Sequence, residues 1–199
     1  MNEQANIMIV GVGGQGTLLA SRILGSVLLE QGYDVKVSEV HGMSQRGGSV
    51  VTYVKYSSDK VYSPVIDRGE ADIILSFELL EAARWVPYLK PGGRIICSTQ
   101  QIDPMPVITG AARYPENLTG KIREKGIDLL AFDALSFALK AGNAKAVNVV
   151  LMGVLSTLLP FPAEDWKKAV RSLVPEKLRE MNLAAFDYGV QAASAAVPA

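Results

Sequence analysis

The stretch best suited to bind a ligand is GVGGQG, at residues 11–16. It follows the apolar run NIMIV and leads into TLLASRILGSVLLEQG, a pattern typical of a strand followed by a helix. In such a turn, the first glycine permits a tight bend, the second lets backbone approach a ligand, and the third lets helix pack on strand. The free N–H groups of the first helical turn favour phosphate or carboxylate. The alternative is that these glycines only permit the turn.

The same glycine spacing is typical of dinucleotide sites, which also need an acidic residue about 20 positions further on. Glu39 stands there, at the end of the second apolar run, DVKVSEV. These two features predict, as one alternative, a stand-alone NAD(P)-dependent oxidoreductase. Another alternative is a module that binds a nucleotide or phosphate without catalysing a reaction.

A second glycine-rich stretch, VHGMSQRGG, occupies residues 40–48 and contains the only histidine, His41. A crossover helix would need helix formers here, whereas glycine and polar residues predominate. We therefore expect an exposed arm, and such loops often carry binding function. The planar guanidinium of Arg46 suits phosphate or carboxylate. The alternative is a solvated connector without a ligand.

Several other chemistries are excluded or not favoured. One cysteine and one histidine cannot form a Cys/His zinc site or ligate an iron–sulfur cluster, so no metal site is predicted, although an all-carboxylate site is left open. Cys97, in RIICST, is expected to be a small core residue. No G-x-S-x-G elbow accompanies His41. Trp85 and Trp166 are expected to pack rather than to bind a ligand.

Composition limits the partners and the location. The chain has 199 residues, and its 20 basic residues balance 20 acidic ones, so no net field attracts nucleic acid or an anionic membrane. The polar start MNEQAN is not an export signal. The most apolar segment, residues 144–160, contains polar residues and is too short to span a membrane, which takes about 20 apolar residues. We expect a soluble, cytoplasmic protein.

The order of elements predicts one α/β domain over residues 1–199. Apolar runs at 6–10, 34–40, 71–77 and 94–99 predict strands, with a turn at KPGG before the last of them. Helical spacing follows the first and third runs, and the first strand–helix–strand unit should be parallel. Residues 49–56 are extended, and 61–66 could form their antiparallel partner.

Beyond residue 102 the character changes. A stretch rich in proline, glycine and threonine predicts a loop with at most one short strand. Helical patterns at 133–142, 145–159 and 163–174 follow, and a last helix begins after Pro175. The predicted fold is therefore Rossmann-like: a mostly parallel sheet flanked by helices, with an antiparallel strand pair and a helical C-terminal part.

The stretches IVGVGGQGTLLASRIL, EVHGMSQRGGSVVTYV and ADIILSFELLEAARWVPYLKPGG together resemble the gamma subunit or domain of 2-oxoacid:ferredoxin oxidoreductases. Within that family, the likeness is greatest to the small (beta) subunit of the indolepyruvate, or arylpyruvate, type. It extends over nearly the whole chain, since AVNVVLMGVL and EMNLAAFDYG also match. The pairing of the glycine stretch with HGMSQRGG is its specific feature.

The resemblance implies an enzyme subunit that is inactive alone. Such complexes decarboxylate a 2-oxoacid on thiamine diphosphate, pass two electrons through iron–sulfur clusters to ferredoxin, and deliver the acyl group to coenzyme A. In the indolepyruvate type, a large partner subunit carries the thiamine diphosphate and the clusters. The present chain would then hold no tightly bound cofactor and would help to form the side of the site that meets coenzyme A.

The resemblance also assigns candidate residues. The anion-accepting loop would comprise Gly11, Gly13, Gly14, Gln15, Gly16 and Thr17. The arm that meets the partner or coenzyme A would extend from Val40 to Gly48, with contacts from Ser44, Gln45, Arg46, Gly47 and Gly48. His41 is the possible catalytic residue, and a merely exposed or capping histidine is the alternative.

Replacing Arg46 tests the role of the arm. Arg46→Ala should weaken the use of coenzyme A or the assembly with the partner, because a charge-assisted contact to phosphate is lost. The melting temperature should stay near that of the original chain, whereas Ile9→Ala in the first strand should cost about 2–5 kcal/mol. Steady-state kinetics and thermal melting measure the two effects. An equal fall in melting temperature for both variants would contradict an exposed arm.

Overall fold

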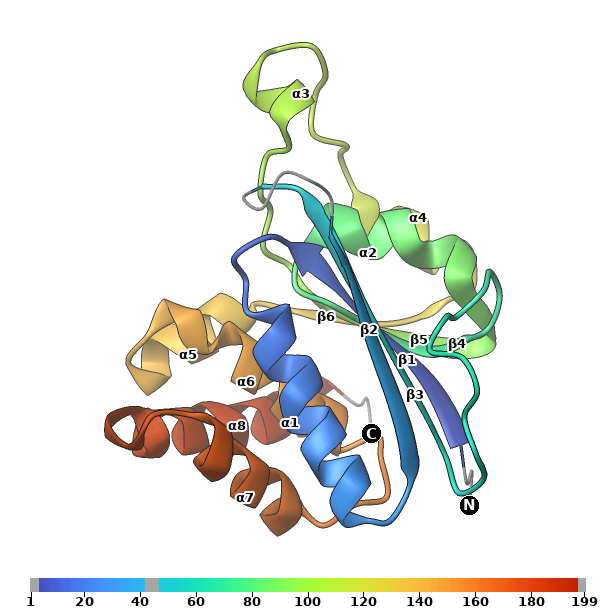
Figure 1. Cartoon of the computed structure of the whole chain (residues 1–199). Helices are drawn as coiled ribbons and strands as arrows, with labels where there is room; N and C mark the ends of the chain where they lie inside the picture. The colour runs from blue at the N-terminus through green and yellow to red at the C-terminus, as the bar shows by residue number, and fades with distance from the viewer. Residues whose placement is uncertain (1–3, 42–46, 197–199) are drawn as a thin grey trace.

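The computed structural model describes residues 4–41 and 47–196. They form a six-stranded sheet in the order β2-β3-β1-β4-β5-β6, with helices on both faces (Figure 1). The strands are β1 (Gln4–Val12), β2 (Asp34–His41), β3 (Ser49–Ser57), β4 (Ala71–Ser76), β5 (Leu89–Ser98) and β6 (Asp128–Phe132). The predicted fold class is confirmed: three of the neighbouring pairs are parallel, and the C-terminal part is helical.

Except for α3, the helices fall into two layers. They are α1 (Thr17–Glu30), α2 (Leu79–Trp85), α3 (Met105–Ile108), α4 (Leu118–Arg123), α5 (Ala134–Ala141), α6 (Val147–Ser156), α7 (Ala163–Leu173) and α8 (Arg179–Ala196). Short 3₁₀ turns at Val86–Tyr88, Ala144–Ala146 and Glu176–Leu178 join some of them. Helices α1 and α5–α8 cover one face of the sheet, while α2 and α4 cover the other (Figure 1). No helix of the described residues is long and apolar enough to cross a membrane.

The alternation along β1 explains why both faces are covered. Ile7 and Ile9 belong to the core beneath α1 and α6, whereas Met8 and Val10 belong to the core beneath α2 and α4. Successive side chains of a strand point to opposite faces, so a strand that is apolar at every position is buried on both.

Strand β3 lies between β1 and β2 and is antiparallel to both. In the pairing of β2 with β3, Asp34 lies opposite Ser57 and His41 opposite Val50, so the two strands form a long hairpin. Strands β1 and β2 run in the same direction, as predicted, but they are not neighbours. The arm at residues 40–48 therefore includes the end of β2 and leads directly into β3.

The prediction that residues 61–66 pair with β3 is wrong. Both edges of β3 are already occupied, so no N–H or C=O row is left for a third strand. Residues 61–66 instead follow an irregular path. The Lys55 ammonium donates to the Val65 carbonyl at 3.1 Å, and Ile66 is buried.

The parallel half of the sheet departs from the sequence prediction at two places. The KPGG stretch lies within β5, where the register with β4 shifts between Ala71 and Ile73, and does not precede the strand. Strand β6 was not predicted; it pairs with β5 as the edge of the sheet. Five residues are too few for a clear period in sequence.

Helices α6 and α8 pack with their backbones in contact. All residues of α6 are buried, as the apolar sequence predicts. A Cβ atom on Gly153 would lie 2.1 Å from the Phe186 carbonyl oxygen, and one on Gly189 would lie 2.0 Å from that of Val150. Only glycine at both positions permits this approach.

We predict that Gly153→Ala lowers the free energy of unfolding by about 1–3 kcal/mol or more, because the new methyl group must push α6 and α8 apart. Gly25→Ala is the matched control, since the nearest atom outside α1 to a Cβ atom there would be Val37 Cγ2, at 4.0 Å. That variant should leave stability unchanged or raise it by up to about 1 kcal/mol, because alanine favours helix. Urea denaturation measures both, and equal losses would contradict the close packing.

Candidate functional site

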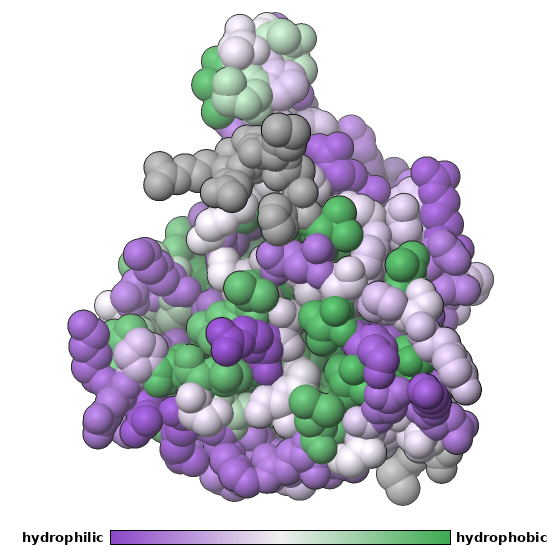
Figure 2. Space-filling model, viewed as in Figure 1, coloured by the Kyte–Doolittle hydropathy of each residue, from purple (hydrophilic) through white to green (hydrophobic). Residues whose placement is uncertain are grey.

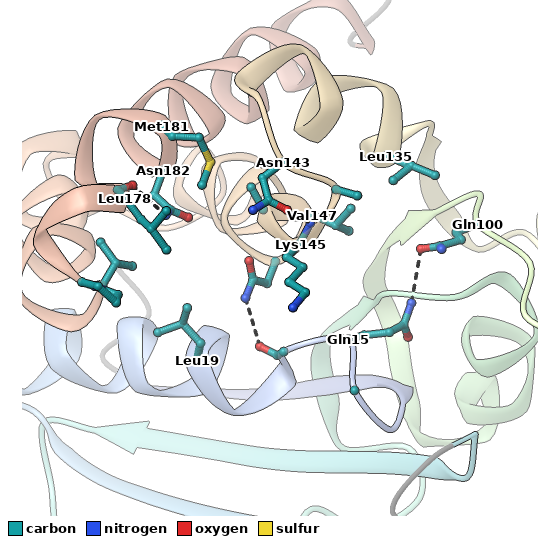
Figure 3. Close-up of a pocket in the computed structure, with 17 residues that line it drawn as sticks. Gln15, Leu19, Gln100, Leu135, Asn143, Lys145, Val147, Leu178, Met181 and Asn182 are labelled. Carbon is teal, nitrogen blue, oxygen red and sulfur yellow. Dashed lines mark hydrogen bonds between the residues drawn. The ribbon is translucent and has the colours of Figure 1, made fainter.

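The side chain of Gln15 holds the glycine loop, residues 11–16, in place. Its Oε1 accepts a hydrogen bond from the Val12 amide at 2.8 Å. Its Nε2 donates to the Phe77 carbonyl at 3.0 Å and to Gln100 Oε1 at 3.4 Å. The loop is thereby joined to the chain that leaves β4 and to the chain that leaves β5 (Figure 3).

The glycines of the loop have different purposes from those predicted. Gly11 lies inside β1, and a Cβ atom there would lie 2.8 Å from Gln15 Oε1 and 3.0 Å from Phe77 Cβ. It therefore makes room for the Gln15 side chain, and the prediction that it permits the bend is wrong. The bend uses Gly14 and Gly16, whose φ angles are +99° and +86°.

The loop leaves several backbone donors available. Gly16 is the N-cap of α1 and offers no side-chain cap, and the first turn of α1 has no acidic residue. Within residues 4–41 and 47–196, the amides of Gly14 and Gly16 have no hydrogen-bond acceptor. Thr17 is buried, while Gly14 is exposed at the apex. Unpaired amides together with the positive end of a helix dipole favour an anion here.

The glycine loop and the end of the arm are bonded to each other. The Gly13 amide donates to the Gly48 carbonyl at 2.9 Å, next to Gly47 with its φ of +76°. The two stretches that the sequence analysis singled out are therefore joined in space. The predicted contacts of Ser44, Gln45 and Arg46 lie outside the described residues, as does the His41 side chain, so their roles stay predictions.

A buried carboxylate anchors the first residue after the arm. Glu81, on α2, accepts a hydrogen bond from the Ser49 hydroxyl at 2.5 Å. It also accepts from Arg84 Nε at 3.0 Å and Trp85 Nε1 at 3.3 Å. The start of β3 is thus bonded both to the glycine loop, through Gly48, and to α2.

Glu78 is the second buried carboxylate of this region. It caps α2 by accepting from the Glu81 amide at 2.8 Å. Its other oxygen accepts from the Ile102 amide at 3.1 Å and the Tyr114 hydroxyl at 2.5 Å. Burial and the bond to this carboxylate raise the pKa of Tyr114.

These two bonds hold both ends of a protruding segment. The chain between Ile102 and Tyr114 extends away from the body and carries α3 at its tip (Figure 1). Met105 and Ile108 are 61% and 65% exposed there, on the part of the surface that projects furthest in Figure 2.

Two cavities flank the glycine loop, and Gly14 and Gly16 line both. The first, of about 370 Å³, lies between the loop and the hairpin of β2 and β3, and is also lined by Glu39 and Val50. The second, of about 450 Å³, lies between the loop and the C-terminal helices (Figure 3). The backbone of the loop therefore borders both cavities.

Glu39 does face the loop, but from the wrong strand for a dinucleotide site. In that fold the acidic residue ends the strand next to β1. Here β3 occupies that place, so β2 lies two strand spacings, about 10 Å, from β1. The Thr52 hydroxyl of β3 also donates to Glu39 at 3.4 Å. This topology disfavours the NAD(P) alternative.

The remaining sequence candidates are structural. Cys97 is fully buried, as predicted, and burial raises the pKa of its thiol. Trp166 is fully buried in the core, and Trp85 packs on Tyr88 with ring centroids 4.9 Å apart. In the part of the chain that the structure describes, no three His, Cys, Asp or Glu side chains are grouped to hold a metal ion.

The polar residues of the larger cavity were not among those predicted from the sequence. Lys145 precedes α6, Asn148 lies in its first turn, and Asn182 is on α8. Asn148 donates to the Gly16 carbonyl at 3.4 Å, and a Cβ atom on Gly16 would lie 2.5 Å from its Nδ2. The sequence does contain a signal for Asn148, because the stretch AVNVVLM places this one polar residue in an otherwise apolar helix.

Comparisons with known proteins agree with this architecture. The family model described as pyruvate ferredoxin/flavodoxin oxidoreductase matches residues 6–192. The indolepyruvate oxidoreductase subunit IorB of Pyrococcus horikoshii is 46% identical over 196 residues, which cover 96% of each chain.

Two solved structures have the same fold. The gamma subunit of a keto/oxoacid ferredoxin oxidoreductase from Geobacter sulfurreducens is 26% identical, with a TM-score of 0.72 over 96% of this chain and 99% of that one. A 2-oxoglutarate:ferredoxin oxidoreductase from Magnetococcus marinus, with 2-oxoglutarate, coenzyme A and succinyl-CoA bound, is 20% identical. Its TM-score is 0.75 over 100% of this chain and 32% of that one.

The family resemblance predicted from the sequence, including the indolepyruvate type within it, is therefore confirmed. This chain belongs to the pyruvate ferredoxin/flavodoxin oxidoreductase family and is an oxidoreductase subunit of the indolepyruvate oxidoreductase IorB type.

Proposed function

We propose that this chain is the small subunit of an indolepyruvate:ferredoxin oxidoreductase and that its glycine loop holds a phosphate group of coenzyme A. The bond between Gly13 and Gly48 carries the proposal, since it joins the anion-binding loop to the end of the arm. The site of this chain is then one wall of an active site that a large subunit completes.

Coenzyme A suits the loop because its phosphates match the available donors. The amides of Gly14 and Gly16 and the start of α1 supply N–H groups and the positive end of a dipole, with no carboxylate in the first turn to repel the ligand. The related enzyme from Magnetococcus marinus has coenzyme A bound, which supports this choice of anion. Arg46, in the arm, is the residue whose side chain would add a charge-assisted contact.

The chemistry of electron transfer belongs to the partner. A cluster needs several thiolates, and this chain has one cysteine, which is buried. Thiamine diphosphate on the large subunit supplies the decarboxylation chemistry when bound. In the assembled complex the 2-oxoacid would lose CO₂, the partner's clusters would carry the two released electrons to ferredoxin, and the acyl group would bond to the sulfur of coenzyme A as the thiol proton leaves.

The residues of this chain bind and orient coenzyme A. The loop fixes the phosphate end, because Gln15 holds its backbone rigidly. The end of β2, the start of β3 and the protruding segment around α3 lie at the same end of the molecule, where the partner is expected to contact it (Figure 1). We place the enzyme in the cytoplasm, where a lone thiol stays reduced.

The first prediction concerns this division of labour. The purified chain with thiamine diphosphate, coenzyme A, indolepyruvate and a dye acceptor should give no turnover, and adding the large subunit should restore it. Reduction of the dye, followed spectrophotometrically, measures both. Turnover by this chain alone would contradict the proposal.

The second prediction concerns the loop. Gly14→Ala should raise the KM for coenzyme A of the assembled enzyme, because a methyl group at the apex blocks the approach of a phosphate. Gly32→Ala is the matched control: both glycines have positive φ angles, +99° and +84°, and both have open space around them. Each variant should lose about 1–2 kcal/mol of stability from the strained backbone. An equal KM in the two variants would disprove a phosphate site at Gly14.

A further inference from the structure

The protruding segment between Ile102 and Tyr114 leaves the carboxyl end of β5, at the same edge of the sheet as the glycine loop (Figure 1). It carries α3 at its tip, which comprises residues 104–112. None of residues 103–113 belongs to either of the two hydrophobic cores formed by the described residues. Packing within this chain therefore does not explain the segment.

Both ends of the segment are fixed to the body of the molecule. Glu78 is only 1% exposed, and it accepts from the Ile102 amide at one end and from the Tyr114 hydroxyl at the other. The same hydroxyl accepts from the Leu80 amide, in α2, at 3.0 Å. Hydrogen bonds to an ionised group are stronger than those between neutral groups. The base of the segment is therefore held in one place on the body.

The tip also fixes its own backbone. The Val107 and Ile108 amides donate to the Pro104 carbonyl at 2.8 Å and 3.1 Å. The Ala112 amide donates to the Pro106 carbonyl at 2.9 Å, which closes the tip. Both acceptors are prolines, whose rings restrict the backbone further. A tip that has its shape before binding loses little conformational entropy when it binds.

The surface of the tip is apolar and uncharged. Met105 and Ile108 are largely exposed, and hydrophobic side chains gather there in Figure 2. Residues 104–112 include no charged side chain, whereas Asp103 and Arg113 flank them on either side. An apolar centre with charges only at its rim is the composition of the core of a protein–protein interface, where an aliphatic anchor enters a pocket.

Hydrogen bonds join the base of the segment to the glycine loop. Gln100 lies two residues before Ile102, and its Oε1 accepts from Gln15 Nε2. The carbonyl of Gln100 accepts from the Leu79 amide, at the start of α2, at 3.0 Å. A protein that binds the tip is therefore held at a fixed place relative to the glycine loop.

The position of the tip indicates the large subunit as its partner. The tip lies at the edge that also carries the glycine loop, the end of β2 and the start of β3 (Figure 1). A helix of four residues covers far less than the area of about 800 Å² per partner that a stable interface needs. The tip must therefore bind as part of a wider contact, and this edge is the surface that the proposed function assigns to the large subunit.

We propose that the segment 103–113 is a rigid docking element, whose Met105 and Ile108 enter an apolar pocket of the large subunit. Glu78 and Tyr114 are positioning residues that fix its base. The inference rests on the proposed function, because the large subunit is the partner that completes the site. Docking of the tip sets the distance between the glycine loop and the part of the active site that the large subunit carries.

Binding of the purified chain to the purified large subunit, measured by biolayer interferometry without substrates, tests the anchor. Ile108→Ser should raise the Kd about tenfold or more, because the anchor no longer fills its pocket. Leu29→Ser is the matched control, at a side chain that is 62% exposed at the end of α1 far from the glycine loop, and it should leave the Kd unchanged. Both variants should melt near the original chain, because neither side chain is buried. An unchanged Kd in Ile108→Ser would overturn the proposal.

Tyr114→Phe tests the positioning role, because it removes the hydroxyl that bonds to Glu78 and keeps the ring. Amide hydrogen exchange at Ile108 should become faster and the Kd should rise, while the chain stays folded. Tyr62→Phe, at a side chain that is 85% exposed, should change neither. If Tyr114 acts through the tip, adding Tyr114→Phe to Ile108→Ser should raise the Kd no further. Additive effects would contradict the positioning role.

A fluorescent label gives an independent readout of docking. Cys97 is buried, so a thiol-reactive dye reports only on an introduced cysteine. Ala111→Cys places an environment-sensitive dye on the tip, and Asp59→Cys places it beyond the far end of β3. The large subunit should shift the emission of the first dye to the blue and leave the second unchanged. No shift at residue 111 would place the partner elsewhere and overturn the proposal.

Two further outcomes separate the alternatives. If the isolated chain is a dimer in light scattering and Ile108→Ser makes it a monomer, a second copy covers the tip and the proposal is wrong. If the original chain does not bind the large subunit at all, the proposed function itself fails. If the original chain and Ile108→Ser bind it equally well, only the docking element fails.

Discussion

The functional end of this molecule depends on the carboxamide of Gln15. Its two polar atoms bond to the end of β1, to the chain after β4 and to the chain after β5, so one side chain connects three neighbouring strands. This network gives the glycine loop a fixed shape before any ligand arrives. The network also requires glycine at position 11, since any side chain on Gly11 would occupy the space of the Gln15 carboxamide. A preorganised loop binds an anion without losing conformational entropy at that moment.

The antiparallel strand β3 changes what this loop can serve. In a dinucleotide fold, the strand beside β1 ends in an acidic residue that binds ribose. Here β3 takes that place, and the arm joins the ends of β2 and β3 at the edge where the glycine loop lies. The chain that follows the arm is bonded to the loop through Gly48 and to α2 through Ser49. The same glycine spacing thus occurs in an arrangement that differs from a dinucleotide site.

The local electric field at the glycine loop, and not the net charge of the chain, favours an anion there. The chain as a whole is neutral, yet α1 begins at the glycine loop without an acidic residue in its first turn. The backbone dipole of α1 therefore favours an anion at this loop in a protein whose composition predicts no attraction for anions. The family places such a subunit in an oxidoreductase, whose substrates are anionic.

Local sequence determined the elements near the N-terminus. The β1–loop–α1 unit, the cap at Gly32 with its φ of +84°, the buried α6 and the core position of Cys97 follow from periodicity and residue type, which act over a few residues. The pairing of two short motifs in the sequence also identifies the family.

Only the tertiary structure decided which strands are neighbours. The pairing of β3 with β1 and β2, the edge strand β6 and the bonds of Gln15 join residues far apart in sequence, and alternation along one strand does not name its partner. The larger cavity arises in the same way, because Gly16, Asn148 and Asn182 meet only when α6 and α8 pack against the loop. Periodicity reports which face of an element is buried, whereas packing between distant elements determines what that face contacts.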